Sequence, residues 1–262
     1  MALRSSQPRC GSLLASLGAL VQLLVLALSL AGWATAQPLN PFQISEEQFR
    51  TQVKRIALVP IAVPPQLGVS ESAKLRFDSL IEAKLLEAGF ATFPAKNWGD
   101  ALARMQQEVG GIVDARTGGL DETKAKTAWT STADEVRSRF QFDAVLLPRI
   151  HVVPAEWRFA VARWDGVSEV LASGLAVFGA PETSGTIRAL SLVVSIGSAD
   201  IEGPAQYRHR AGIQVLEKFS PTMAERLSGK MLTPLAPEEL LANDERNRAA
   251  VEIALGPLVK KR

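Results

Sequence analysis

Residues 55 to 63 read RIALVPIAV, a run that is apolar after its first residue and rich in β-branched side chains. Such a run predicts a strand that is buried on both faces, as in a parallel sheet. Residues 70 to 89 carry apolar side chains at three- and four-residue spacings, which predicts an amphipathic helix. Leu80 and Ile81 lie at the centre of its apolar stripe, so we expect both to be buried. Residues 90 to 93 complete a strand–helix–strand unit, for which a right-handed crossover is expected.

The elements that follow change from parallel to antiparallel character. Asp165-Gly166 between two extended runs predicts a two-residue hairpin turn, and Pro148 inside an apolar strand indicates a bulge or an edge position. The other predicted helices and strands lie at 97–109, 121–140, 143–153, 186–199, 206–216, 220–230, 237–241 and 244–259. The predicted fold class is α/β with α+β character in the carboxyl half, a mixed β-sheet with flanking helices.

The first 36 residues have the pattern of a cleavable signal peptide. Arg4 and Arg9 give a positive start, an apolar run follows from Leu13 to Gly32, and Ala34-Thr35-Ala36 is a small-residue cleavage site. We therefore expect cleavage after Ala36 and a periplasmic or secreted protein. The alternative is that the run stays uncleaved as an inner-membrane anchor, because about 20 apolar residues can span a bilayer.

The expected mature chain is electrically balanced and contains no cysteine. Residues 1–36 hold two of the 29 basic residues, none of the 27 acidic ones, and Cys10, the one cysteine of the chain. A balanced charge gives no electrostatic footprint for nucleic acid. We expect no nucleic-acid partner and no stable membrane insertion after cleavage. The predicted organisation is a signal peptide at 1–36, a leader at 37–54 and a single mixed α/β domain at 55–262.

The sequence contains no recognisable catalytic or cofactor motif. A phosphate-binding loop, a Gly-x-Ser-x-Gly elbow and a His-Glu-x-x-His pair do not occur in it. Its two histidines, His151 and His209, are too far apart in sequence to suggest a metal site. We therefore expect no catalytic residue, no cofactor and no metal ion. An acid-based hydrolase is the alternative, with Asp114, Asp121 or Glu156 among its carboxylates.

Two further features could carry binding. Four tryptophans could form a platform that stacks on sugars, although aromatic residues at such spacings more often belong to the core: Trp98, Trp129, Trp157 and Trp164. Tyr207, Arg208 and Arg210 place an aromatic and two arginines close together, and these residue types are enriched at protein interfaces. We take these three as candidate partner-binding residues. The alternative is a solvated strand edge that charge protects from pairing.

The order of elements resembles a known superfamily. The resemblance rests on four segments, which are IALVPI at 56–61, AGF at 88–90, FDAVLLPRI at 142–150 and the turn from Asp200 to Gly203. In this order they resemble the periplasmic α/β domain of the curli-secretion lipoprotein superfamily, the TolB amino-terminal domain and penicillin-binding-protein activator lipoproteins. The resemblance implies an envelope protein that binds or assembles partners without catalysis. Two departures are that no lipidated cysteine follows the signal and that the 157–171 segment is short and charged, so a pore is not implied.

These observations combine into one leading hypothesis and two alternatives. The chain is expected to be a soluble, non-catalytic periplasmic protein that acts by binding, as an accessory protein of the bacterial envelope with another envelope protein as its partner. The alternatives are the acid-based hydrolase and the uncleaved anchor. The sequence leaves the oligomeric state open.

Overall fold

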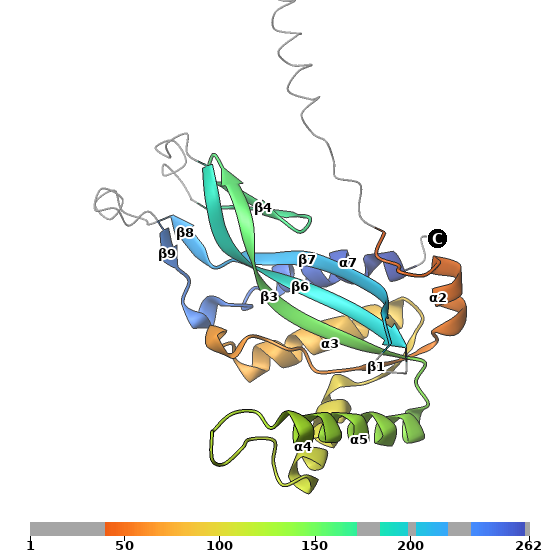
Figure 1. Ribbon diagram of the computed structural model, residues 1–262. Helices are drawn as coiled ribbons and strands as arrows, with labels where there is room; N and C mark the ends of the chain where they lie inside the picture. Colours follow the sequence, from red (N-terminus) through yellow and green to blue (C-terminus); the bar gives the residue numbers. More distant parts are fainter. Residues whose placement is uncertain (1–39, 172–183, 199–202, 220–231, 260–262) are drawn as a thin grey trace, which may run out of the picture. The chain divides into compact units, whose positions relative to one another are not determined.

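In the described part of the chain, a mixed seven-stranded sheet carries helices on both faces (Figure 1). The structure is a computed structural model that describes residues 40–171, 184–198, 203–219 and 232–259. The described residues from Pro41 on belong to one compact unit. This architecture confirms the predicted α/β class. The predicted signal peptide, the helix at 220–230 and most of the 200–203 turn lie outside the described residues.

The elements of this unit follow one another along the chain as α2 (Glu46–Gln52), β1 (Arg55–Leu58), η1 (Pro65–Leu67), α3 (Glu71–Glu87), β2 (Ala91–Phe93), α4 (Ala95–Glu108), α5 (Glu122–Phe140), β3 (Ala144–Arg158), β4 (Val161–Trp164), β5 (Val167–Val170), β6 (Ser184–Ser198), β7 (Ala205–Val215), β8 (Glu217–Phe219), β9 (Leu232–Pro234), η3 (Pro237–Glu239), α7 (Asp244–Leu255) and η4 (Gly256–Leu258). β8 and β9 form a separate two-stranded sheet.

The predicted strand–helix–strand unit is present. β1 pairs in parallel with β2 and, on its other side, with the start of β3. α3 joins the first two strands, and the Ser70 hydroxyl caps it by accepting from the Ala73 N–H. Ile81 is fully buried, as expected, but Leu80 is only half-buried. Leu80 packs against the edge of the core cluster and lines a groove on the side of α3 that faces α7.

β3 is longer than the sequence pattern predicted and organises the sheet. Its start pairs with β1 and its end with β4, whereas β6 runs beside it from Ala144 to Arg158 without a shift in register. Pro148 therefore causes no bulge. The Pro148 carbonyl accepts from the Ala62 N–H at 3.0 Å, so the backbone of residue 148 faces the side where β1 has already ended. The regular pairing of β1 with β3 ends at Leu58 and Leu146, so the missing N–H of Pro148 lies beyond it.

Two tight turns shape the far end of the sheet. The predicted turn at Asp165-Gly166 joins β4 to β5, with φ of 34° and 82°. A second turn, at Phe159-Ala160, joins β3 to β4 with φ of 50° and 60°. The sequence did not predict this turn, because phenylalanine and alanine rarely adopt positive φ. In it, the Arg158 guanidinium lies 4.9 Å from the centre of the Phe159 ring.

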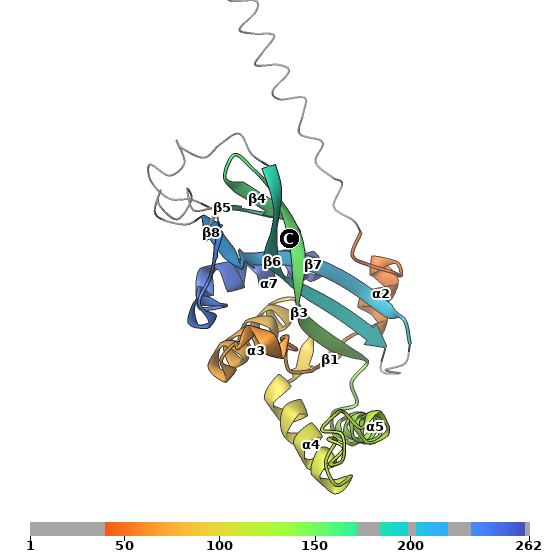
Figure 2. The ribbon, with the colours of Figure 1, turned by 60° about the vertical axis from the view of Figure 1, so that its left-hand side comes forward.

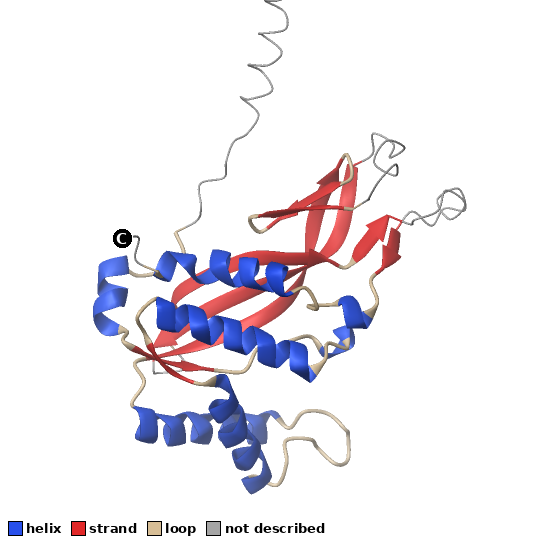
Figure 3. Ribbon diagram, turned by 180° about the vertical axis from the view of Figure 1, so that it is seen from behind, coloured by secondary structure: helices blue, strands red, loops and turns tan. Residues whose placement is uncertain are grey.

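Among the described residues, buried side chains form three clusters around the sheet. α3 and α7 cover one face, as Figure 3 shows, and α4 and α5 cover the other face over β1 and the start of β3. A third cluster lies under the β4–β5 hairpin, where Trp157 and Phe219 meet edge to face. The four tryptophans considered for sugar stacking belong to these clusters: Trp98, Trp157 and Trp164 are buried and Trp129 is half-buried. This placement corrects the alternative of an exposed stacking platform.

Candidate functional site

The three residues predicted to bind a partner separate onto two faces of β7. Successive side chains of a strand point to opposite faces, and Arg208 and Arg210 are exposed whereas Tyr207 is fully buried. The Tyr207 hydroxyl donates to the Ala254 carbonyl at 2.5 Å, and burial raises the pKa of Tyr207. Tyr207 is therefore a core residue that anchors α7 to the sheet. This corrects the expectation that its ring belongs to an exposed surface.

The strand register brings a third arginine beside the other two. Arg149 of β3 is opposite Val193 of β6, and Val193 is opposite Arg210 of β7, so the three side chains share one face. Arg208, two residues before Arg210, is on the same face, opposite Ser195. Strand spacing places the Arg149 and Arg210 Cα atoms roughly 10 Å apart, and those of Arg208 and Arg210 roughly 7 Å apart. We call Arg149, Arg208 and Arg210 the arginine face.

The arginine face is open among the described residues. In Figure 1 the side of β3, β6 and β7 that faces the viewer carries no described helix over its middle, since α4 and α5 lie over the start of β3. All three arginines are exposed. Val193 between them is only 7% exposed, which is consistent with long arginine stems that lie along apolar surface and keep their charged ends in water.

One carboxylate partly balances this surface. Asp165, at the hairpin turn, lies 3.8 Å from an Arg210 nitrogen and accepts a hydrogen bond of 2.6 Å from the Ser191 hydroxyl. Among the described residues, Arg149 and Arg208 have no ion-pair partner within 4.0 Å. Three guanidinium groups and one carboxylate leave the face with a net positive charge. It is therefore suited to anionic groups.

The backbone beside the arginines is not an open strand edge. The Arg208 N–H donates to the Pro41 carbonyl at 2.8 Å, so the leader segment covers this part of β7. The Gly212 N–H donates to the Asp165 carbonyl at 2.9 Å, so the hairpin turn covers the next part. Covering of this kind protects an edge from pairing with other chains. The arginine face therefore exposes side chains, whereas the backbone of β7 beside Arg208 and Gly212 is already hydrogen-bonded.

The two histidines lie on different faces. His151 is exposed and continues the arginine face by one row, opposite Ser191. His209 is half-buried on the side of Tyr207, and burial lowers its pKa below the ordinary value. Within the described residues, no group of three or more His, Cys, Asp and Glu side chains is placed to hold a metal ion.

The acids considered for hydrolysis do not converge. Asp114 accepts from backbone N–H groups in the α4–α5 loop, and Asp121 caps α5. Glu156 lies at the other end of the sheet, in the wall of a cleft of about 670 Å³. That wall also includes Arg163 and Asp165. The cleft thus brings Glu156 near Asp165, and neither Asp114 nor Asp121 lines it.

Arg149 is the residue that sequence reasoning missed. It lies within a predicted strand, roughly 60 residues before Arg208 and Arg210. Only the order β3-β6-β7 makes them neighbours. The available signal was a charged residue within an otherwise apolar strand, because a charge in such a position marks a face that is not covered.

No family model matches the chain, and no curated protein matches it. Among solved structures, a lipoprotein of Neisseria meningitidis matches with a TM-score of 0.30 and 14% identity, over 61% of this chain and 81% of that one. The resemblance to the curli-secretion superfamily stays a prediction. No helix in the described part of the chain is long and apolar enough to cross a membrane.

Proposed function

We propose that the chain is an exported, non-catalytic accessory protein of the bacterial envelope that captures a protein partner through the arginine face. The observation that carries the proposal is the exposed cluster of Arg149, Arg208 and Arg210, of which, among the described residues, only Arg210 has a carboxylate within 4.0 Å. The partner is an envelope protein that presents an acidic segment. The export pattern at residues 1–36 supports the location.

The chemistry of the side chains favours carboxylates. A guanidinium group offers a planar fork of N–H donors that can bind both oxygens of one carboxylate. Three such groups within roughly 10 Å can hold successive acidic side chains of an extended segment, whose alternate residues are spaced roughly 7 Å apart. Exposed charges are screened over a Debye length of about 8 Å at physiological ionic strength. Capture should therefore weaken as the salt concentration rises.

Photocrosslinking in intact cells locates the contact. A photoreactive amino acid at position 149 or 208 should give one crosslinked species of defined mass. The same amino acid at position 116, an exposed arginine of the α4–α5 loop, serves as the control and should not give that species. Crosslinks at position 116 alone would contradict the proposal.

Charge reversal tests the role of the arginines themselves. Arg149→Glu combined with Arg208→Glu should reduce capture of the crosslinked partner by about tenfold or more, because two ion pairs become repulsive. The thermal midpoint should stay near that of the parent, since both side chains are exposed and unpaired in the described structure. Arg116→Glu is the matched control. Undiminished capture by the double variant, with its fold intact, would rule out the arginine face as the interface.

A further inference from the structure

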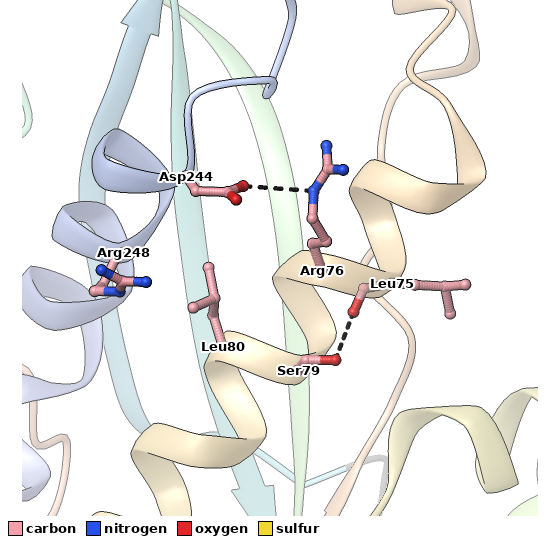
Figure 4. A pocket seen from close by; sticks show the side chains of 6 residues that line it. All are labelled: Leu75, Arg76, Ser79, Leu80, Asp244 and Arg248. Atoms are coloured by element: carbon pink, nitrogen blue, oxygen red, sulfur yellow. Dashed lines mark hydrogen bonds and ion pairs between the residues drawn. The ribbon is translucent and has the colours of Figure 1, made fainter.

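A groove lies between α3 and α7, on the sheet face opposite the arginine face. It has a volume of about 360 Å³ and is lined by Leu75, Arg76, Ser79, Leu80, Asp244 and Arg248. Figure 4 shows Leu80 pointing into the space between the helices, with Arg248 on the opposite wall. The Ser79 hydroxyl donates to the Leu75 carbonyl of its own helix at 2.9 Å.

Ion pairs join the two helices on either side of the groove. Arg76 of α3 lies 3.4 Å from a carboxylate oxygen of Asp244, and Lys84 lies 2.6 Å from one of Glu252. The paired positions rise together along both helices, so α3 and α7 run in the same direction. On each helix, the residues of the two pairs are eight positions apart, which is about two helical turns.

Halfway between these two ion pairs, α7 presents a cation that faces no anion on α3. One turn after Arg76 and Asp244, α3 presents Leu80 and α7 presents Arg248. Arg248 is exposed, and among the described residues no carboxylate lies within 4.0 Å of it. On α7 itself, Asp244 and Glu252, four residues before and four residues after Arg248, are already paired with Arg76 and Lys84 of α3. The groove therefore holds the Arg248 guanidinium, which has no ion-pair partner among the described residues, beside the apolar side chain of Leu80.

We infer that this groove is a docking site for an amphipathic helix of a partner protein, one that places a carboxylate on Arg248 and an apolar side chain on Leu80. Arg248 is a cation with no ion-pair partner among the described residues, so a carboxylate on the partner helix would complement its charge. Two packed helices also present ridges and grooves that accept a third helix. Leu80 supplies the apolar contact, because the side chain of Leu75, although 49% exposed, points away from α7 (Figure 4). This site is independent of the arginine face.

A defined peptide tests the inference on the full-length chain. The probe is a fluorescent alanine-based helix with leucine, glutamate and leucine spaced four and then three residues apart, which places them on one helix face. The comparison peptide carries glutamine in place of glutamate. Fluorescence anisotropy should show that the parent binds the glutamate peptide about two- to fivefold more tightly, as an exposed ion pair provides.

The protein variants decide whether Arg248 is responsible. Arg248→Ala should bind both peptides equally and retain the thermal midpoint of the parent. Arg116→Ala, which removes an exposed arginine far along the chain from the groove, should preserve the preference for glutamate. Equal binding of both peptides by the parent, no measurable binding of either, or a preference that survives in Arg248→Ala would each overturn the inference.

Discussion

At the scale of single residues, Gly212 marks the closest approach between the β4–β5 hairpin and β7. A Cβ atom at this position would lie 2.1 Å from a methyl carbon of Val167 and 2.6 Å from the Trp164 ring nitrogen. The Trp164 N–H also donates to the Leu190 carbonyl at 3.0 Å, so the indole cannot move aside without losing that bond. The absence of a side chain at residue 212 therefore allows the hairpin to close on the sheet.

Gly212→Ala should destabilise the protein by about 3 kcal/mol, the upper end of the range for overpacking a well-filled site. Gly197→Ala is the matched control, because a Cβ there meets nothing within 4 Å. The control should be neutral or slightly stabilising, since alanine reduces the entropy of the unfolded chain. Chemical denaturation of both variants measures the difference. Similar losses in the two would show that the hairpin does not rest on residue 212.

Asp78 is a buried carboxyl group whose ionisation opposes folding. It is 7% exposed, and its carboxylate accepts from the Ile61 N–H at 2.9 Å. Burial raises its pKa from 3.8 to about 6, although the hydrogen bond from Ile61 acts in the opposite direction. Because the folded-state pKa lies above the unfolded value, the favourable contribution is fully present below pH 4 and is lost as the pH rises through about 6.

Asp78→Asn should remove this dependence, because the amide oxygen can still accept from Ile61 but carries no charge. The free energy of unfolding of the variant should rise relative to that of the parent between pH 4 and pH 7. Asp143→Asn should show the opposite trend, and only below pH 4, where the parent loses the contribution of the ionised Asp143 carboxylate as the pH falls. Burial raises the pKa of Asp143, but bonds from Arg55 and from the Lys54 N–H outweigh it and lower the pKa. Denaturation midpoints measured at several pH values check both, and parallel curves for parent and Asp78→Asn would contradict the argument.

At the scale of elements, local chemistry predicted where helices and turns begin. Ser70 and Asp121 are the caps of α3 and α5, and each accepts a backbone N–H from the first turn. Asp165-Gly166 forms the turn that its two residue types favour. These signals act over a few residues, so one sequence is enough to interpret them.

Features that depend on distant partners were not predictable in the same way. β3 continues through Pro154 to Arg158 because β6 pairs with it throughout. The Phe159-Ala160 turn forms because β3 and β4 pair on both sides of it. The burial of Tyr207 and the position of Arg149 follow from the strand order. Pairing between strands that are distant in sequence decides these positions, and local residue preferences do not predict that pairing.

The two central residues of α3 provide a prediction at this scale. Ile81→Ala should cost about 2–5 kcal/mol, because the side chain is fully buried against the sheet. Leu80→Ala should cost clearly less, since Leu80 is half-buried and lines the groove towards α7. Urea denaturation of the two variants compares them directly. An equal or larger loss for Leu80→Ala would mean that the helix turns a different side to the core.

At the scale of the whole molecule, export is the first event to test. The small residues Ala34 and Ala36 after a long apolar run predict a mature chain that begins at Gln37. Mass spectrometry of the protein recovered from the cell envelope measures this terminus directly. Recovery of a chain that still begins at Met1 or Ala2, in the membrane fraction, would instead support the anchored alternative.

The length of β3 affects how the protein unfolds. Leu146, Val145 and Trp157 of this one strand belong to three different buried clusters, and β6 spans all three beside it. Opening any one cluster therefore strains the pairing that supports the others. Heat should unfold the unit in a single cooperative transition, and amide protons of β3 and β6 should exchange with solvent only through global unfolding.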